Sequence, residues 1–155
     1  RFLTGSEVTE VTAYGDVVID EKLKELGDVD IAIVMLKFEN GSIGVIDDSR
    51  QSGYGYDQRT EVQCEKGCVQ VENIYPNSAK ISTSDGILSE KPVWFFLERY
   101  NDAFIAESKE FIDAVINDKE PPVGGADGLM AVVIAMAAKI SLTERRPVKL
   151  SEIKW

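Results

Sequence analysis

The sequence of 155 residues contains no histidine. This absence excludes a Ser-His-Asp or Cys-His catalytic site built from this chain alone. Cysteine is scarce as well, and Cys64 and Cys68 are too few for a zinc site made from cysteine and histidine, so we predict no metal site. The two cysteines flank Glu65-Lys66-Gly67, which predicts a three-residue hairpin loop with Gly67 in the left-handed conformation. A disulfide is compatible with this spacing but is not required by it.

Long apolar runs and an excess of positive charge are also lacking. The longest strongly apolar run, Leu129 to Ala138, falls well short of the about 20 residues that cross a bilayer. The net charge of -10 opposes binding to nucleic acid and to anionic membranes. No signal or transit pattern opens the chain. We therefore expect a cytoplasmic protein with no nucleic-acid or membrane partner.

The first five residues resemble the end of a helix. Arg1 to Gly5 lack an initiator methionine, and Gly5 stands where a left-handed glycine cap is expected. A helix end without its helix predicts that the chain is a fragment. A processed terminus would have the same appearance.

The first ninety residues carry strand patterns, and the charged segment 16–27 gives no prediction. Val29 to Phe38 is apolar on both alternating faces, which predicts a strand that is covered on both sides. Asn40-Gly41 predicts the hairpin that follows it. The predicted strands are Val8 to Tyr14, Val29 to Phe38, Ile43 to Asp48, Gln58 to Cys64, Cys68 to Glu72, Ser78 to Thr83 and Gly86 to Ser89.

Two helices are predicted after the strands. Leu97 to Ile116 has apolar residues at helical spacing, which indicates an amphipathic helix that faces a sheet. A second helix is expected to start near Asp127, which can cap it, and to run to about Leu142. Its first three turns are almost wholly apolar, which predicts burial between layers or at a subunit contact. Strands followed by helices predict an α+β fold, with a mostly antiparallel open sheet and helices packed on one face.

The most distinctive segment is 50–59, which contains a pair of tyrosines. Tyr54 and Tyr56 are two residues apart, so an extended backbone would point both rings to one side. Gly53 and Gly55 leave the opposite side open to another backbone or to a ligand. Such a cluster suits a small polyhydroxylated ligand, and an edge strand whose tyrosines cover a core has the same spacing. The charged residues around the pair are Arg50, Asp57 and Arg59.

Glycine-rich runs do not indicate a nucleotide site. Gly53-Tyr54-Gly55 lacks the third glycine of the dinucleotide fingerprint, and a strand follows it. Gly124-Gly125 precedes a helix but follows no parallel strand, so we interpret it as a loop and cap. Asp47 and Asp48 point to opposite faces of their strand, so at most one of them can join a site near the tyrosines. We predict no cofactor-binding residue in this chain.

Several stretches resemble the C-terminal domain of inositol 2-dehydrogenases, in the glucose–fructose oxidoreductase and inositol dehydrogenase superfamily. The resemblance covers nearly the whole chain. The stretches are Asp47 to Val62, Gly67 with Val69 to Asn73, Phe96 to Phe104 with Glu107, Phe111 and Ile112, Asp127 to Ala131 with the pair Ala137-Ala138, and Arg146 to Val148.

The resemblance implies an oxidoreductase whose reacting groups lie outside this sequence. In that family an N-terminal Rossmann domain binds the nicotinamide cofactor and supplies a lysine, and an aspartate and a histidine come from a helix just before the C-terminal sheet. None of these positions is present here, so no residue is predicted to be catalytic. The family's C-terminal sheet forms one wall of the substrate pocket and packs sheet against sheet between subunits. By this resemblance residues 1–155 form a single substrate and oligomerisation domain.

The resemblance selects Tyr54 and Tyr56 as substrate contacts. Arg50 and Asp57 are further candidates, although each could equally belong to a surface ion pair. The implied reaction is NAD-dependent oxidation of the 2-hydroxyl of myo-inositol to a ketone, and this chain alone would be inactive. Two alternatives stay open: a stand-alone self-association module without a substrate, and a family member that acts on another sugar or cyclitol. The inositol stereoisomer, NAD against NADP, and dimer against tetramer are not decided by this sequence.

Overall fold

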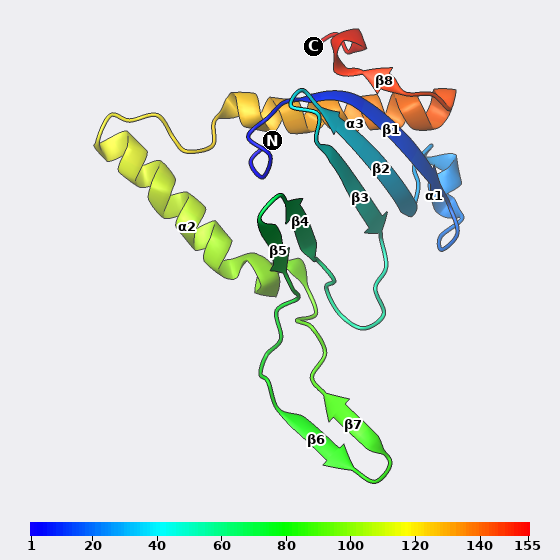
Figure 1. Ribbon diagram of the computed structural model, residues 1–155, viewed down its shortest axis with the longest axis vertical. Helices are drawn as coiled ribbons and strands as arrows, with labels where there is room; N and C mark the ends of the chain where they lie inside the picture. Colours follow the sequence, from blue (N-terminus) through cyan, green and yellow to red (C-terminus); the bar gives the residue numbers. More distant parts are fainter. The chain divides into compact units, whose positions relative to one another are not determined.

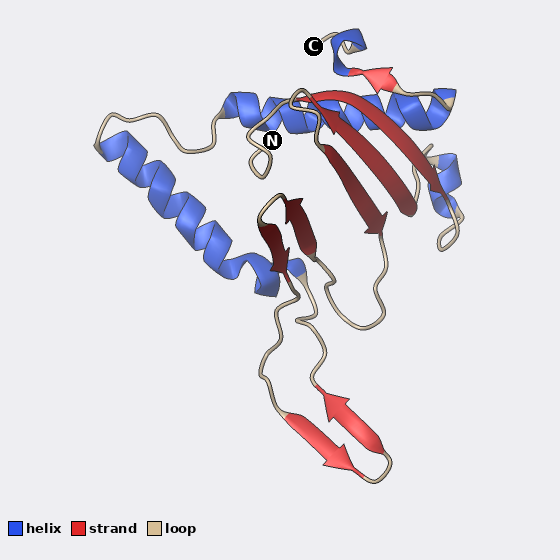
Figure 2. Cartoon of the chain, viewed as in Figure 1, coloured by secondary structure: helices blue, strands red, loops and turns tan.

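The computed structural model describes residues 1–155 and divides into two compact units. The first unit comprises Arg1–Gln51 and Val123–Trp155, and the second comprises Ser52–Pro122. Helices and antiparallel strands are present in both units (Figure 2), which confirms the α+β prediction.

The first unit is built on a four-stranded antiparallel sheet in the order β3-β2-β1-β8 (Figure 1). Asn40-Gly41 forms the predicted turn between β2 and β3, with Gly41 at φ +85° and the Asn40 side chain accepting the Ser42 N–H at 3.0 Å. The strands are β1 (Val8–Asp16), β2 (Ile31–Phe38), β3 (Ile43–Ser49) and β8 (Val148–Lys149).

A short helix and a buried aspartate shape the connection from β1 to β2, a segment without a prediction above. Helix α1 (Lys22–Glu25) occupies part of this connection. Asp30 is only 2% exposed, and its carboxylate accepts hydrogen bonds from three successive backbone N–H groups, those of Val18, Ile19 and Asp20, at 2.7–2.8 Å. One side chain therefore holds the loop that leaves β1.

Helix α3 (Gly125–Glu144) packs against β1 and β8. It begins two residues before the predicted start, and Asp127 accepts the Gly124 N–H at 3.0 Å, which satisfies a donor that the helix itself leaves unpaired. The helix ends at Arg145, which has the left-handed φ of 56°, just before Pro147. A short 3-10 helix, η1 (Leu150–Glu152), follows β8.

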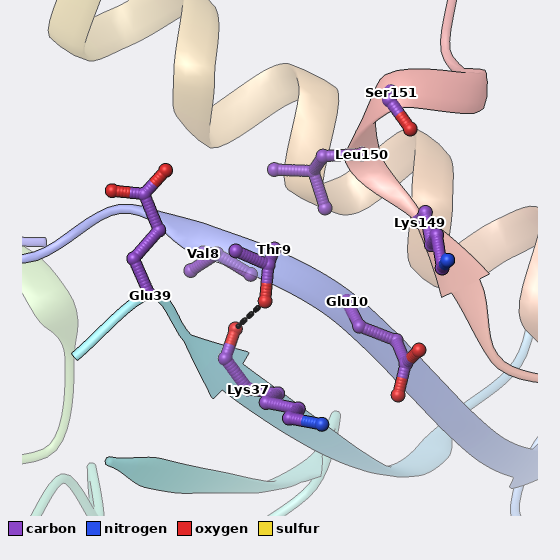
Figure 3. Close-up of a pocket in the computed structure, with 8 residues that line it drawn as sticks. All are labelled: Val8, Thr9, Glu10, Lys37, Glu39, Lys149, Leu150 and Ser151. Atoms are coloured by element: carbon purple, nitrogen blue, oxygen red, sulfur yellow. Dashed lines mark hydrogen bonds between the residues drawn. The ribbon is translucent and has the colours of Figure 1, made fainter. Parts of the chain in front are cut away.

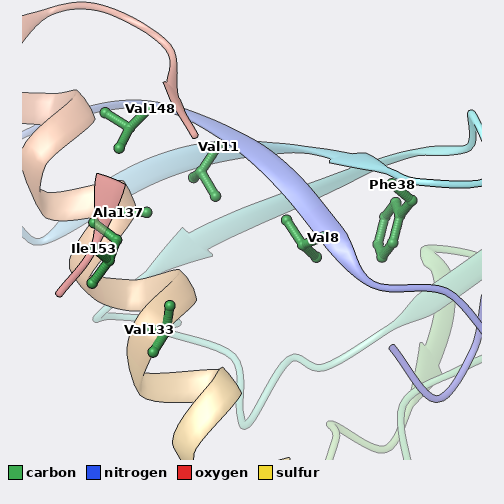
Figure 4. Close-up of a cluster of buried hydrophobic side chains, with 7 residues drawn as sticks. All are labelled: Val8, Val11, Phe38, Val133, Ala137, Val148 and Ile153. Atoms are coloured by element: carbon green, nitrogen blue, oxygen red, sulfur yellow. The ribbon is translucent and has the colours of Figure 1, made fainter. Parts of the chain in front are cut away.

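One face of α3 and one face of the sheet form the hydrophobic core (Figure 4). Val133 and Ala137 lie one helical turn apart and are buried, whereas Val132 and Met136 are exposed. By length and composition alone α3 could cross a membrane, although core helices of soluble proteins pass the same test. The apolar run of ten residues therefore underestimated the length of this apolar helix. The buried core residues are Val8, Val11, Phe38, Val133, Ala137, Val148 and Ile153.

The opposite face of the sheet is left exposed within the first unit. Ile33 and Met35 are each 47% exposed, and the cross-strand partner of Met35 on β3, Val45, is exposed as well. Within this unit β2 is therefore covered on one side only, and the predicted second cover is not found there. Helix α3 packs on one face of the sheet, whereas a strand that is apolar on both faces requires packing on each face.

The second unit contains two hairpins and a long helix, α2 (Phe96–Ile116). Within this unit Ala114 is the buried residue of α2, and Phe104, Phe111 and Ile112 are exposed, so no packing of its apolar face on a sheet is observed inside the unit. The hairpin strands are β4 (Thr60–Cys64) with β5 (Gly67–Val71), and β6 (Lys80–Thr83) with β7 (Gly86–Ser89).

The loop between β4 and β5 differs from the prediction. Gly67 pairs with Cys64 and has φ +159°, so the loop has two residues, and Gly67 belongs to the strand rather than to a left-handed position. Cys68 pairs with Gln63, which puts it on the opposite face of the hairpin from Cys64. Both cysteines are free and exposed, and this register keeps their side chains apart.

Candidate functional site

Tyr54 lies in a turn and Tyr56 follows it, so neither tyrosine lies on the expected strand. Gly53 and Tyr54 are in a turn, and Gly55 has φ +139°, so the period-two argument does not apply. The close backbone approach expected at Gly55 is observed, because a Cβ atom there would lie 2.7 Å from the carbonyl oxygen of Pro92. Tyr56 follows the turn, and its N–H donates to the carbonyl of Val93 at 2.8 Å. Gly55 thus allows the chain to turn between the two tyrosines.

Asp57 is the centre of a hydrogen-bond cluster that includes Tyr54. The Tyr54 hydroxyl, on a residue that is 49% exposed, donates to Asp57 Oδ2. The Arg59 Nε donates to Asp57 Oδ1 at 2.8 Å, and the Asn73 amide donates to the same oxygen at 3.0 Å. Two predicted substrate contacts, Tyr54 and Asp57, are therefore brought together.

The cluster lowers the pKa of Asp57 to about 2. The hydrogen bond from Arg59 is the largest cause, followed by that from the Tyr54 hydroxyl, while partial burial acts in the opposite direction. The side chain of Asp57 is 17% exposed. Asp57 is therefore a fixed anion at neutral pH, and this charge is well suited to accept hydroxyl and guanidinium donors.

We predict that the Asp57 carboxyl titrates near pH 2, against about 3.9 for an unperturbed aspartate. Because the folded pKa is depressed, this carboxylate stabilises the fold in full above about pH 4, and the stabilisation is lost as the pH falls towards 2. A carbon-detected NMR titration of the side-chain carboxyl measures this value. Arg59→Gln should raise it, and an unchanged midpoint in that variant would show that Arg59 is not the cause.

A second arm of the cluster contains Tyr56 and Tyr100. Their rings meet edge to face with centroids 6.0 Å apart, and the Tyr100 hydroxyl donates to the Gln58 side chain. The Gln58 N–H donates to the Asn73 side-chain oxygen at 2.8 Å, so Asn73 links both arms. Beside this arm, the Nε of Arg99 is buried without a hydrogen-bond partner, a kind of group that a polar ligand can satisfy.

Arg50, the remaining predicted contact, lies in the first unit. Its guanidinium lies 3.8 Å from Asp28, and both side chains are more than half exposed. Its N–H donates to the carbonyl of Asp30 at 2.9 Å. Arg50 therefore forms an ion pair with Asp28, and Asp57 forms one with Arg59 at 2.8 Å. Both contacts agree with the alternative that these residues belong to surface ion pairs.

Asn73 and Tyr100 were not selected by the sequence analysis. The predicted three-residue loop would have placed Arg59 opposite Asn73, but in the observed β4–β5 hairpin Thr60 pairs with Val71. Continuing that antiparallel register by two residues places Gln58 opposite Asn73. Tyr100 had no signal either, because its helical spacing identifies it only as part of an apolar face.

Two grooves on the first unit do not include the tyrosines. One of about 450 Å³ runs between β1, β2 and β8 (Figure 3), where the Thr9 hydroxyl donates to the Lys37 carbonyl at 3.1 Å. Charged residues of both signs are among those that line it. The lining residues are Val8, Thr9, Glu10, Lys37, Glu39, Lys149, Leu150 and Ser151. The other, of about 400 Å³, is bounded by Ala13, Tyr14, Gly15, Asp16, Leu142 and Arg145.

The start of α3 does not fit the phosphates of a nicotinamide cofactor. The start of α3 is the only place where a glycine pair precedes a long helix, and there the Asp127 carboxylate already accepts the Gly124 N–H. A carboxylate at that position opposes a phosphate. No group of three or more potential metal ligands is found among the histidine, cysteine, aspartate and glutamate residues.

The fold and sequence match a known family of enzymes. Residues 1–150 match the C-terminal alpha/beta domain of an oxidoreductase family. The chain belongs to this family. Its relatives include the myo-inositol 2-dehydrogenase of Thermotoga maritima, 44% identical over 99% of this chain, and the inositol 2-dehydrogenase of Rhizobium meliloti, 40% identical over 97%. The chain spans 46% of the length of each, so it corresponds to the C-terminal part of these relatives.

Solved structures of the family agree with the fold. A probable dehydrogenase from Thermotoga maritima superposes with a TM-score of 0.95 at 44% identity, over 99% of this chain and 46% of that one. A myo-inositol dehydrogenase from Lactobacillus casei, solved with NAD(H) and myo-inositol, superposes with a TM-score of 0.78 at 26% identity. That superposition covers 99% of this chain and 44% of the other. The α+β prediction and the resemblance to this family are both confirmed.

Proposed function

We propose that this chain is the C-terminal part of a cytoplasmic, NAD-dependent inositol 2-dehydrogenase that oxidises the 2-hydroxyl of myo-inositol to a ketone. The observation that carries the proposal is 44% identity to a myo-inositol 2-dehydrogenase along 99% of this chain. A relative with bound NAD(H) and myo-inositol supports the choice of cofactor and substrate. Residues 1–155 act as one substrate and oligomerisation domain, and NAD is bound by a part of the enzyme outside this sequence.

The geometry around Tyr54 supports a role as one wall of a polyol pocket. An exposed phenol beside the ionised Asp57 provides hydrogen-bonding groups, and the Tyr56 and Tyr100 rings provide apolar surface for the ring C–H groups. Neither groove of the first unit includes Tyr54 or Tyr56, and Tyr54 is 49% exposed in the second unit. Small ligands are normally enclosed over most of their surface, which requires a second wall.

The test is a kinetic comparison in the full-length enzyme. We expect Tyr54→Phe to raise KM for myo-inositol about tenfold, the value of about one hydrogen bond, while kcat changes less than about twofold. Tyr56→Phe should act in the same direction with a smaller effect. Tyr75→Phe is the matched control, because Tyr75 is an equally exposed tyrosine of the same unit.

Assays of the wild-type enzyme on different substrates discriminate between the alternatives. A wild-type enzyme that oxidises another cyclitol or sugar faster than myo-inositol would reassign the substrate within the family. An enzyme with no NAD-dependent oxidation of any inositol or sugar would favour the self-association module.

We further propose that the exposed sheet face forms a homo-oligomer contact. Ile33, Met35 and Val45 lie on this face and are exposed in the single chain. We expect Ile33→Lys to raise the dissociation constant of the oligomer at least about tenfold, because it places a charge in an apolar contact. Sedimentation velocity over a range of concentrations measures this, with Ile87→Lys on β7 as the control. A chain that is monomeric throughout would refute the contact.

A further inference from the structure

The carboxylate of Asp57 has no acceptor position left for a ligand. Oδ1 accepts from Arg59 at 2.8 Å and from Asn73 at 3.0 Å. Oδ2 accepts from a second nitrogen of Arg59 at 3.1 Å and from the hydroxyl of Tyr54. A carboxylate offers about four lone-pair positions, and all four are used by the protein.

The direction of the Tyr54 hydrogen bond determines what Tyr54 can offer to a ligand. A phenol has one O–H, and here it is donated to Asp57, which as an anion can only accept. The phenolic oxygen keeps its lone pairs and lies on a residue that is half exposed. Tyr54 can therefore accept a hydrogen bond from a ligand but has no proton left to donate.

We infer that Asp57 is a positioning residue, which fixes Tyr54 as a hydrogen-bond acceptor for a hydroxyl group of the polyol substrate. This inference rests on the proposed function and assigns a role within the same site. Asp57 acts through Tyr54 and does not itself contact the substrate. The site then selects a ligand group that carries an O–H, and it disfavours an isosteric group that can only accept.

The surroundings of Asp57 hold this arrangement in place. Asn73 donates to Asp57 and accepts the Gln58 N–H, so it ties the carboxylate to the backbone two residues before β4. At the other end of the turn, Gly55 lies against the Pro92 carbonyl with no room for a side chain. A group fixed in this way loses little conformational entropy when the substrate binds.

A double-mutant cycle in the full-length enzyme tests the inference. Tyr54→Phe and Asp57→Asn should each raise KM for myo-inositol about tenfold and change kcat less than about twofold. The double variant should be no worse than the worse single variant, because Asp57 has no effect once the Tyr54 hydroxyl is absent. Asn73→Ala should likewise raise KM in the enzyme that retains Tyr54. In the Tyr54→Phe background it should leave KM unchanged.

The control is Glu61→Gln, which should leave KM unchanged. Glu61 is a carboxylate of the same unit that accepts hydrogen bonds from Gln63 and Gln70 but contacts no tyrosine. An about hundredfold rise of KM in the double variant would show independent contacts and overturn the inference. An unaffected Asp57→Asn enzyme would also overturn it. A wild-type enzyme that does not oxidise inositol at all would instead overturn the proposed function.

Monofluorinated myo-inositols test the donor requirement separately. Fluorine replaces a hydroxyl with a group of similar size that cannot donate a hydrogen bond. We expect one such analogue to lose about tenfold in kcat/KM with the wild-type enzyme and to lose nothing relative to myo-inositol with Tyr54→Phe. If both enzymes discriminate against every analogue equally, the assignment of Tyr54 as an acceptor is wrong.

Discussion

Replacing Ser141 with alanine is expected to lower the free energy of unfolding by about 2 to 4 kcal/mol. Ser141 is fully buried on α3, where its hydroxyl accepts the Ala13 N–H at 2.9 Å and donates to the Arg146 carbonyl at 2.6 Å. β8 pairs with β1 only at Glu10 and Val11, so Ser141 provides the partner for β1 just beyond the end of that short strand. Alanine would leave both backbone groups unpaired.

Urea denaturation followed by circular dichroism measures the effect of Ser141→Ala. Ser108→Ala is the matched control, because the Ser108 hydroxyl also bonds a carbonyl, that of Phe104 at 2.9 Å, but on an exposed helix surface. The control should change the free energy by less than about 0.5 kcal/mol. Equal effects of the two substitutions would show that burial of Ser141 is not what makes its hydrogen bonds important.

Asp30→Asn is expected to lower Tm by about 5 °C or more at neutral pH. Its two carboxylate oxygens accept three backbone N–H groups, and an amide must turn an NH2 group towards at least one of those donors. Thermal unfolding followed by circular dichroism measures the change. Asp16→Asn is the control, because Asp16 is exposed and its side chain accepts only the Val17 N–H. Equal Tm values for both variants would contradict the role of Asp30.

The pH dependence of the Asp30 effect has a definite sign. Burial raises the pKa of Asp30, but the backbone donors, led by the Val18 N–H, together lower it below its usual value. A depressed pKa means that the stabilisation is present in full above about pH 4 and is lost as the pH falls below it. The difference in Tm between the wild type and Asp30→Asn should therefore shrink in acid. A difference that grows below pH 4 would contradict this assignment.

Local patterns in the sequence predicted most strands and both long helices. The Asn40-Gly41 turn depends on backbone preferences that neighbouring residues determine, and it was found as predicted. Helix α3 ends at Glu144, two residues beyond the predicted Leu142. The patterns also identified the apolar faces of β2 and α2, but they did not identify which elements bury those faces. Periodicity shows that a face is apolar, and it does not show whether this chain or another one buries it.

Contacts between distant residues were beyond the sequence patterns. Asp30 looks like an ordinary loop residue until the backbone of residues 18–20 is seen to turn towards it, and Ser141 looks like any small residue in an apolar helix. At the candidate site the tyrosines were selected, but the arrangement around them was not. Gly55 adopts φ +139°, which breaks the strand on which the prediction depended, so Tyr54 reaches Asp57 three residues later.

The first unit is discontinuous in the sequence, and this has a consequence for its synthesis. β1, β2 and β3 are complete by Ser49, but α3 begins only at Gly125 and β8 only at Val148. At about 5 to 20 residues per second, a ribosome needs several seconds or more to supply the missing layer. During that interval the nascent sheet has no helix on the face that α3 will bury. This period, before release from the ribosome, is when the chain is most exposed to chaperones and to misfolding.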